Sequence, residues 1–228
     1  MIVTKRDKLK NKYYISIMEL LKKSNENTEI SEKEKQKRIT TAAKHYGNFL
    51  EAIGYNYKLD PQTENTPTRV AKSWINDLVM GSFSPAPKMT EFENEEEYNG
   101  LVIQTGIRVN SICAHHNLPF YGWATVGYLP GSKVVGLSKL NRIVDWFARR
   151  PQMQESLTQQ IHDFIQKELQ SSSVAVSISS KHMCCGVRGI KHPESVMTTN
   201  KFSGMFMEKN NMIREEFLHA ISKNGNNF

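Results

Sequence analysis

Residues 101–161 read LVIQTGIRVNSICAHHNLPFYGWATVGYLPGSKVVGLSKLNRIVDWFARRPQMQESLTQQI, and the order of patterns in this stretch decides the fold. The first part, over residues 101–114, is long and rich in β-branched residues, which is typical of a strand. The next part begins at Pro119 and is aromatic and β-branched up to the turn-forming residues Pro130 and Gly131. Together the two parts predict a pair of antiparallel strands.

Helical spacing replaces the strand pattern in the second half of this stretch. Apolar residues recur in LSKLNRIVDWFARR, which predicts an amphipathic helix with its stripe at Leu140, Ile143, Val144 and Phe147. Pro151 should break this helix and start another, because proline is tolerated in a first turn but not in a helix interior. The second helix is expected to run through Gln154, Leu157, Ile161, Ile165 and Leu169.

Two more strands follow these helices. They are predicted in SVAVSISSKHMC, residues 173–184, and SVMTTNKFSGMF, residues 195–206, and a short helix is expected around residues 213–221. Parallel α/β winding would alternate strands and helices, so the order of two strands, two helices and two strands predicts an α+β domain with an antiparallel sheet and helices on one face. Such a sheet has two open edges, which further copies of the chain would pair.

The chain before the main domain has a different, helical character. Ser31 and Glu34 have the form of a capping box at the start of an amphipathic helix, and Pro67 suits the first turn of a second helix. We therefore expect three parts, which are a charged, flexible lead over residues 1–30, a helical region over 31–90 and the main domain over 91–228.

Composition limits the partners of the protein. No run reaches the roughly 18 apolar residues that span a bilayer, and no apolar core follows the basic N-terminus, so we expect a cytoplasmic protein without membrane contact. The net charge of +7 would suit an anionic partner, but much of the excess lies near the N-terminus, and we expect no nucleic acid partner. Three cysteines are too few for a disulfide framework, which leaves metal binding open.

Two short motifs carry candidate metal ligands. CAHH holds Cys113 and His116, and HMCC supplies Cys184 later in the chain. Two thiolates and one imidazole would make a zinc site whose fourth position can hold water, which is the catalytic rather than the structural arrangement. Either motif alone is equally consistent with a structural cysteine beside an exposed histidine. The prediction of a metal site therefore depends on both motifs.

Two further histidines stand beside these ligands. Residues two apart in a strand point to one face, so His182 should share a face with Cys184, and His115 with Cys113. Imidazole titrates near neutral pH, and these side chains are therefore candidates for moving protons at a metal site. Cys185 is expected to point away, because neighbouring residues in a strand alternate in direction.

A basic group of residues could bind a polyphosphate. Ser138, Lys139 and Arg142 stand at the start of a predicted helix, where backbone amides attract anions, and Arg188 follows HMCC. The alternative is a set of solvated surface charges. Glu155, in the first turn of the next helix, could stabilise that helix or accept hydrogen bonds from the edge of a guanine base.

In these motifs the chain resembles the GTP cyclohydrolase I family. The matching segments are ENTPTRVAK, SICAHH, GYLPGSKVVGLSKLNRIVDWFARRPQMQESLTQQI, SKHMCCGVRGI and IREEFL, in that order, and they cover roughly residues 35 to 222. The resemblance implies the tunnelling fold, in which ββααββ units pair edge to edge into barrels. It also implies a homodecamer of two pentameric rings, with active sites between subunits.

The same resemblance implies roles for individual residues. Cys113, His116 and Cys184 would bind one Zn²⁺ ion per subunit, and His115 and His182 would be catalytic. The substrate GTP would be recognised at its guanine by Glu155, with Gln154 beside it. The residues expected at the ribose and triphosphate are Ser138, which would also be catalytic, Lys139, Arg142 and Arg188, with Arg69 and Lys72 reaching the phosphates from a neighbouring subunit.

The implied reaction converts GTP to 7,8-dihydroneopterin triphosphate and formate. Activated water would add at C8 of the guanine, the histidines would relay protons, and a second hydrolysis of the opened ring would release formate. Ribose ring opening, an Amadori-type rearrangement and ring closure would complete the product. That product would feed folate, pterin or deazaguanine synthesis.

One residue departs from the family pattern. The family usually has an acid between the cysteine and the histidines, whereas this chain has Ala114. A carboxylate lost beside a ligand commonly costs about 10- to 100-fold in metal affinity or activity. Two alternatives to an active enzyme therefore stay open, which are a catalytically silent GTP-binding homologue and a related enzyme acting on another purine or pterin.

Overall fold

A computed structural model of the chain describes residues 23–208 and 211–224. Most of the predicted charged lead, residues 1–22, lies outside this part of the chain. Within the described residues, no helix combines the length and the apolar character that a membrane crossing requires.

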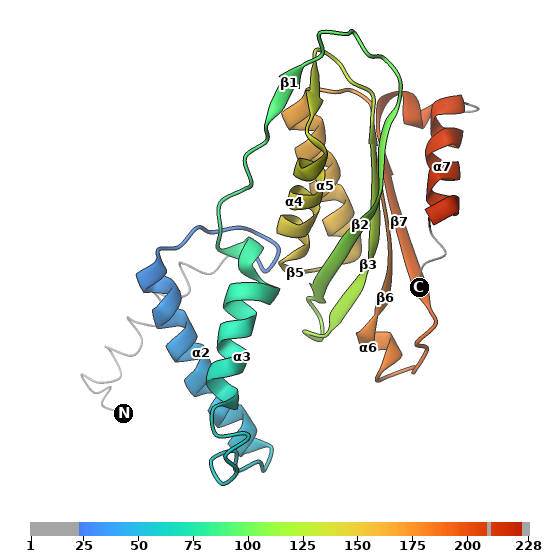
Figure 1. The fold of residues 1–228 in the computed structure, drawn as a ribbon. Coiled ribbons are helices and arrows are strands. Elements are labelled where there is room, and N and C mark those ends of the chain that lie inside the picture. The colour runs from blue at the N-terminus through green and yellow to red at the C-terminus, as the bar shows by residue number, and fades with distance from the viewer. Residues whose placement is uncertain (1–22, 209–210, 225–228) are drawn as a thin grey trace, which may run out of the picture.

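A curved sheet forms the centre of the main domain (Figure 1). Its five strands stand in the order β5-β2-β3-β6-β7. Four of them pair antiparallel, as the sequence predicts, and these are β2 (Val102–Cys113), β3 (Pro119–Tyr128), β6 (Val174–His182) and β7 (Val196–Phe202). A smaller sheet pairs β1 (Glu91–Glu93) with β4 (Lys133–Val135).

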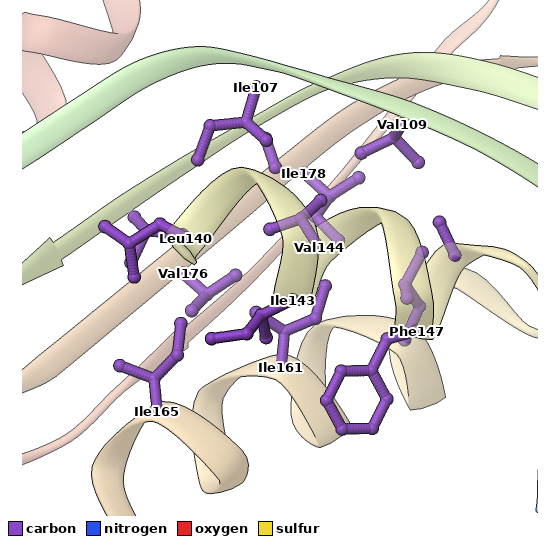
Figure 2. Packing of buried hydrophobic residues seen from close by; sticks show 14 of the residues in the cluster. Ile107, Val109, Leu140, Ile143, Val144, Phe147, Ile161, Ile165, Val176 and Ile178 are labelled. Carbon is purple, nitrogen blue, oxygen red and sulfur yellow. The ribbon is translucent and has the colours of Figure 1, made fainter. Parts of the chain in front are cut away.

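Two helices cover one face of the large sheet. They are α4 (Leu137–Ala148) and α5 (Gln154–Leu169), and their predicted apolar stripes are confirmed. Ile143, Val144 and Ile161 are fully buried against Val176 and Ile178 of β6 (Figure 2). Burial of these side chains is the main favourable term in the folding of the domain.

The chain between the two helices differs from the prediction. Pro151 does not start α5; with Gln152 it forms β5, which pairs parallel with Ile112 and Cys113 at the end of β2. A two-residue strand has no periodicity of its own, so only the tertiary pairing creates it. The pairing ties the first turn of α5 to the CAHH motif.

A third helix covers part of the opposite face, so the prediction of helices on one face holds only for α4 and α5. This helix, α7 (Met212–Asn224), follows the turn η3 (Gly204–Met207). Phe206 and Phe217 are fully buried there against Ala175 of β6. The outward side of β6 is apolar at this end, and α7 removes it from water.

The N-terminal helices lie beside the sheet rather than on it (Figure 1). They are α2 (Glu32–Ala52), α3 (Thr66–Ser73), η1 (Trp74–Leu78) and η2 (Met80–Ser82). Ser31 caps α2 as predicted, because its side chain accepts a hydrogen bond from the backbone of Glu34. The Glu34 carboxylate accepts from Arg38 instead of completing the capping box. Ile39 of α2 packs on Ala71 and Ile75.

A buried arginine joins the N-terminal segment to the main domain. Arg150 is 3% exposed, and its guanidinium lies 3.9 Å from the ring centroid of Trp146. Its Nε donates to the Gly81 carbonyl and its Nη1 to the Asn25 carbonyl, at 3.1 and 3.2 Å. Burial lowers the pKa of Arg150 to about 10, which still leaves it charged at neutral pH. Gly81 also approaches α4 closely, since a Cβ atom there would lie 1.9 Å from the Trp146 carbonyl oxygen.

The substitution Gly81→Ala should therefore destabilise the junction. We expect a loss of about 1–3 kcal/mol, the usual cost of forcing extra atoms into a packed interior. Thermal unfolding of the purified protein measures it, with Gly131→Ala as control, because a Cβ atom at Gly131 would meet nothing within 4 Å. Equal midpoints for the two variants would contradict the close approach.

Candidate functional site

Three segments of the chain meet at one end of the large sheet (Figure 1). β2 ends there at Cys113, and the turn that follows carries the rest of CAHH. β6 ends beside the start of β3, because His182 is the register partner of Phe120. β5 brings in the first turn of α5 through its pairing with β2. Strand pairing thus brings together residues that are far apart in the sequence.

The three predicted metal ligands come together at this end. The ligand atoms of Cys113, His116 and Cys184 all lie within 4.8 Å of one another, and no other group of this kind is found in the described part of the chain. A tetrahedral ion with bonds of about 2.0–2.3 Å separates its ligand atoms by about 3.5–4 Å. Two sulfurs and one imidazole nitrogen at this spacing fit zinc, and three protein ligands leave a fourth position for water.

The surroundings of Cys184 disfavour a free thiolate. Burial, together with the adjacent Cys113 thiol, raises the pKa of Cys184 to about 11. A thiol with that pKa is protonated at neutral pH and is a poor nucleophile. A bound divalent cation reverses this by stabilising the thiolate.

The backbone at the two histidine–cysteine pairs differs from the predicted strands. Cys184 lies in a short helix, α6 (Met183–Gly186), and His115 lies in the turn after β2, so the strand alternation rule applies to neither pair. His115 is exposed beside His116, with the ring centroids 6.1 Å apart. His182 is the last residue of β6.

Cys185 does not point away from the site as expected. Its sulfur lies 4.0 Å from that of Cys184, although it is not part of the three-ligand group. The reason is again α6: neighbouring residues on a helix are about 100° apart, whereas neighbours in a strand are on opposite faces.

His182 is held on two sides. Its ring stacks on Phe120, with centroids 4.6 Å apart and an interplanar angle of 7°. Its Nε2 atom lies 2.8 Å from Oε1 of Gln154. Burial lowers the pKa of His182, and the nearby carboxylate of Glu155 opposes that shift. The ring is therefore fixed in position and biased towards its neutral form.

Gln154 is buried and held by partners within the chain. It is 1% exposed, and its amide nitrogen donates to the Ile178 and Met197 carbonyls and to the Thr199 hydroxyl. Its amide oxygen accepts from the Ser180 hydroxyl and lies 2.8 Å from Nε2 of His182, so both ends of the amide have partners within the chain. The sequence carries a signal for this, because a polar residue in the buried stripe of a helix needs internal partners.

The other expected substrate residues lie in three places. Glu155 is exposed in the first turn of α5, and Arg188 is exposed directly after α6, both at the end of the sheet that holds the metal ligands. Ser138, Lys139 and Arg142 belong to the first half of α4. That helix begins near the opposite end, where the Val135 amide donates to the Tyr128 hydroxyl at the end of β3.

One chain therefore does not bring the α4 residues to the metal ligands. β3 is ten residues long, which corresponds to about 33 Å between the two ends of the sheet. α4 covers twelve residues, or about 18 Å, on its way back towards β5. Arg69 and Lys72 are exposed on α3, which lies beside the sheet (Figure 1).

Comparisons with known proteins give one consistent family. The family model described as GTP cyclohydrolase I matches residues 42–222. The GTP cyclohydrolase 1 of Sulfurihydrogenibium sp. (strain YO3AOP1) is 43% identical over 177 residues, which cover 76% of this chain and 90% of that protein. The GTP cyclohydrolase 1 of Flavobacterium johnsoniae is 40% identical over 188 residues, or 82% of each chain. Among solved structures, the apo form of an archaeosine synthase QueF-Like is similar over 47% of this chain and 97% of its own, with a TM-score of 0.39 and 19% identity.

The metal site makes a prediction about zinc retention. Cys113→Ser and Cys184→Ser should each lose zinc, because serine is a far weaker ligand for it than a thiolate. Cys185→Ser should keep one zinc per chain, although the same substitution is made next to Cys184. Metal analysis after dialysis against buffer measures this. Zinc loss from Cys185→Ser equal to the loss from Cys184→Ser would contradict the assignment of the three ligands.

Proposed function

The chain belongs to the GTP cyclohydrolase I family, and from this membership we propose that it hydrolyses GTP to 7,8-dihydroneopterin triphosphate and formate. The observation that carries the proposal is the cluster of Cys113, His116 and Cys184, all of which lie inside the matched range. A family match alone would be compatible with a homologue that has lost its catalytic activity. The cluster supports an active hydrolase.

We propose that these three residues hold one Zn²⁺ ion per subunit. When bound, zinc supplies a Lewis acid and lowers the pKa of water to about 7, which provides a nucleophile at neutral pH. The buried Cys113 and half-buried Cys184 anchor the ion on the protein side, while the exposed His116 lies on the side that solvent and substrate reach.

The two further histidines are the proposed proton carriers. Addition of water at C8 of guanine releases a proton, and opening of the imidazole ring requires a proton at the departing nitrogen. His182 is stacked and held in position, and burial lowers its pKa, which favours the neutral form that can first accept a proton. His115 lies in the exposed turn next to a ligand, where it can exchange protons with water.

Glu155 is the proposed guanine anchor. A carboxylate accepts two parallel hydrogen bonds, and guanine presents two adjacent donors at its N1–H and 2-amino group. Its place in the first turn of α5 supports this, because it is exposed and close enough to His182 to affect the pKa of that residue. Adenine lacks the matching pair of donors, so the carboxylate would discriminate between the two purines.

The triphosphate site is proposed to be shared between subunits. Ser138, Lys139 and Arg142 lie too far from the metal ligands of their own chain, so a second copy must supply them to complete a site. The edge strand β7 supports such pairing, since Val196 and Met197 expose 42% and 36% of their surface. We propose the homodecamer of two pentameric rings, with Arg188 from the metal-bearing chain and Arg69 and Lys72 from neighbours.

A reducing cytoplasm is the proposed compartment, because thiolate ligands must stay reduced.

Ala114 favours one alternative, which is a homologue that binds GTP but does not hydrolyse it. It stands exposed next to Cys113, where the family usually has an acid. Its backbone is nevertheless held, because the Ala114 amide donates to the Gln152 carbonyl at 3.3 Å. The turn that carries His115 and His116 thus has support that does not depend on the missing carboxylate.

Incubation of zinc-loaded protein with GTP separates the enzyme from this alternative. We expect release of formate together with a dihydroneopterin-like absorbance spectrum, and neither from the Cys184→Ser variant. Stoichiometric zinc and bound GTP without formate would contradict the proposed activity and support the silent homologue.

The guanine anchor makes a separate prediction. Glu155→Ala should lower kcat/KM for GTP by about 10- to 100-fold, the cost of a lost hydrogen bond to a charged group. It should also reduce discrimination against ATP in competition assays. Glu168→Ala removes the same charge from the other end of α5 and serves as the control. Unchanged selectivity in Glu155→Ala would refute the anchor.

A further inference from the structure

We infer that Gln154 is a positioning residue that holds His182 in one tautomer, with the hydrogen on Nε2 and Nδ1 as the basic atom. This goes beyond the family resemblance in the sequence, which implies only that Gln154 stands beside the guanine anchor. Its catalytic meaning rests on the proposed function, but the tautomer itself follows from hydrogen-bond geometry.

The orientation of the Gln154 amide is determined by its partners. Nε2 lies 2.9 Å from the Ile178 carbonyl oxygen and 3.0 Å from that of Met197. Backbone carbonyls only accept hydrogen bonds, so this end of the amide must be the NH₂ group. The opposite end, Oε1, accepts from the Ser180 hydroxyl at 2.8 Å. A flipped amide would place its oxygen against two carbonyl oxygens.

The amide orientation fixes the tautomer of His182. Oε1 only accepts, and it lies 2.8 Å from Nε2 of His182, so Nε2 must carry a hydrogen. A neutral imidazole has one N–H, which leaves the lone pair on Nδ1. No residue in the described part of the chain forms a hydrogen bond with Nδ1, so this nitrogen remains available to a substrate or to water.

The arrangement is rigid because its members are buried and share partners. Gln154 is 1% exposed and Ser180 is fully buried. The Thr199 hydroxyl, which accepts from Gln154, also contacts the Thr158 hydroxyl at 2.6 Å. Rotation of the His182 ring would break its stack on Phe120 and remove a donor from a buried oxygen. Gln154 thus links α5, β6 and β7 to the orientation of one imidazole.

The wild-type protein tests the tautomer directly. Solid-state NMR of the zinc-loaded protein, labelled with ¹⁵N at histidine, distinguishes protonated from unprotonated ring nitrogens at pH 8, where an ordinary imidazole is neutral. The His182 signals are identified by their loss in His182→Ala. We expect a protonated Nε2 and an unprotonated Nδ1. A hydrogen on Nδ1 would overturn the inference without the need for any other variant.

Gln154→Met tests the positioning role, because methionine keeps the length of the side chain and removes the amide. We expect both tautomers of His182, retained zinc, an unchanged KM for GTP and a kcat lower by about 10- to 100-fold, the effect of groups that orient a ligand or catalytic side chain. Gln166→Met is the matched control, since Gln166 lies on the same helix and donates to the Ser203 hydroxyl. It should leave the tautomer unchanged.

Two outcomes would count against the inference or against its premise. An unchanged tautomer in Gln154→Met, with a raised KM, would overturn the positioning role and make Gln154 a substrate ligand. Absence of formate release by the wild-type protein would refute the proposed function instead. The NMR measurement uses no GTP, so the two failures are distinguishable.

Discussion

The pairing of β3 with β2 on one side and with β6 on the other is the constraint on which the whole site depends. It places the turn after Cys113 next to the end of β6, so that the first two ligands meet the third across a long stretch of sequence. The same register stacks His182 on Phe120. A shift of one residue in either pairing would turn Phe120 to the other face and disperse the cluster.

A second, buried layer of polar contacts supports this geometry. The amide oxygen of Gln154 holds the His182 ring at its Nε2 atom, and β5 ties the start of α5 to the end of β2. Gln152 and Gln154 are 2% and 1% exposed, so both glutamines belong to the interior of the domain. The ligands and histidines supply the chemistry, while this layer determines how accurately they are placed. The α4 residues are separate from both, since the chain carries them to the far end of the sheet.

The sequence predicted the helical stripes and four strands because burial imposes their periodicity, as Ile143 and Ile161 show. It did not predict β5, α6 or the side covered by α7, which depend on long-range packing rather than on local pattern. The metal ligands were predictable because their chemistry is specific. The Gln154 network was not, because it requires the register between β6 and β7. The distance of Ser138 from the metal was implicit in the strand order, since β3 starts at the metal end and leads away from it.

X-ray absorption at the zinc edge would identify and count the ligand atoms of the bound ion. We expect two sulfur neighbours at about 2.3 Å and two lighter neighbours at about 2.0–2.1 Å, which would be His116 and one water or substrate atom. Three sulfur neighbours would contradict this expectation, because Cys185 would then complete the set. A coordination shell without sulfur would contradict it as well, because neither Cys113 nor Cys184 would then bind the ion.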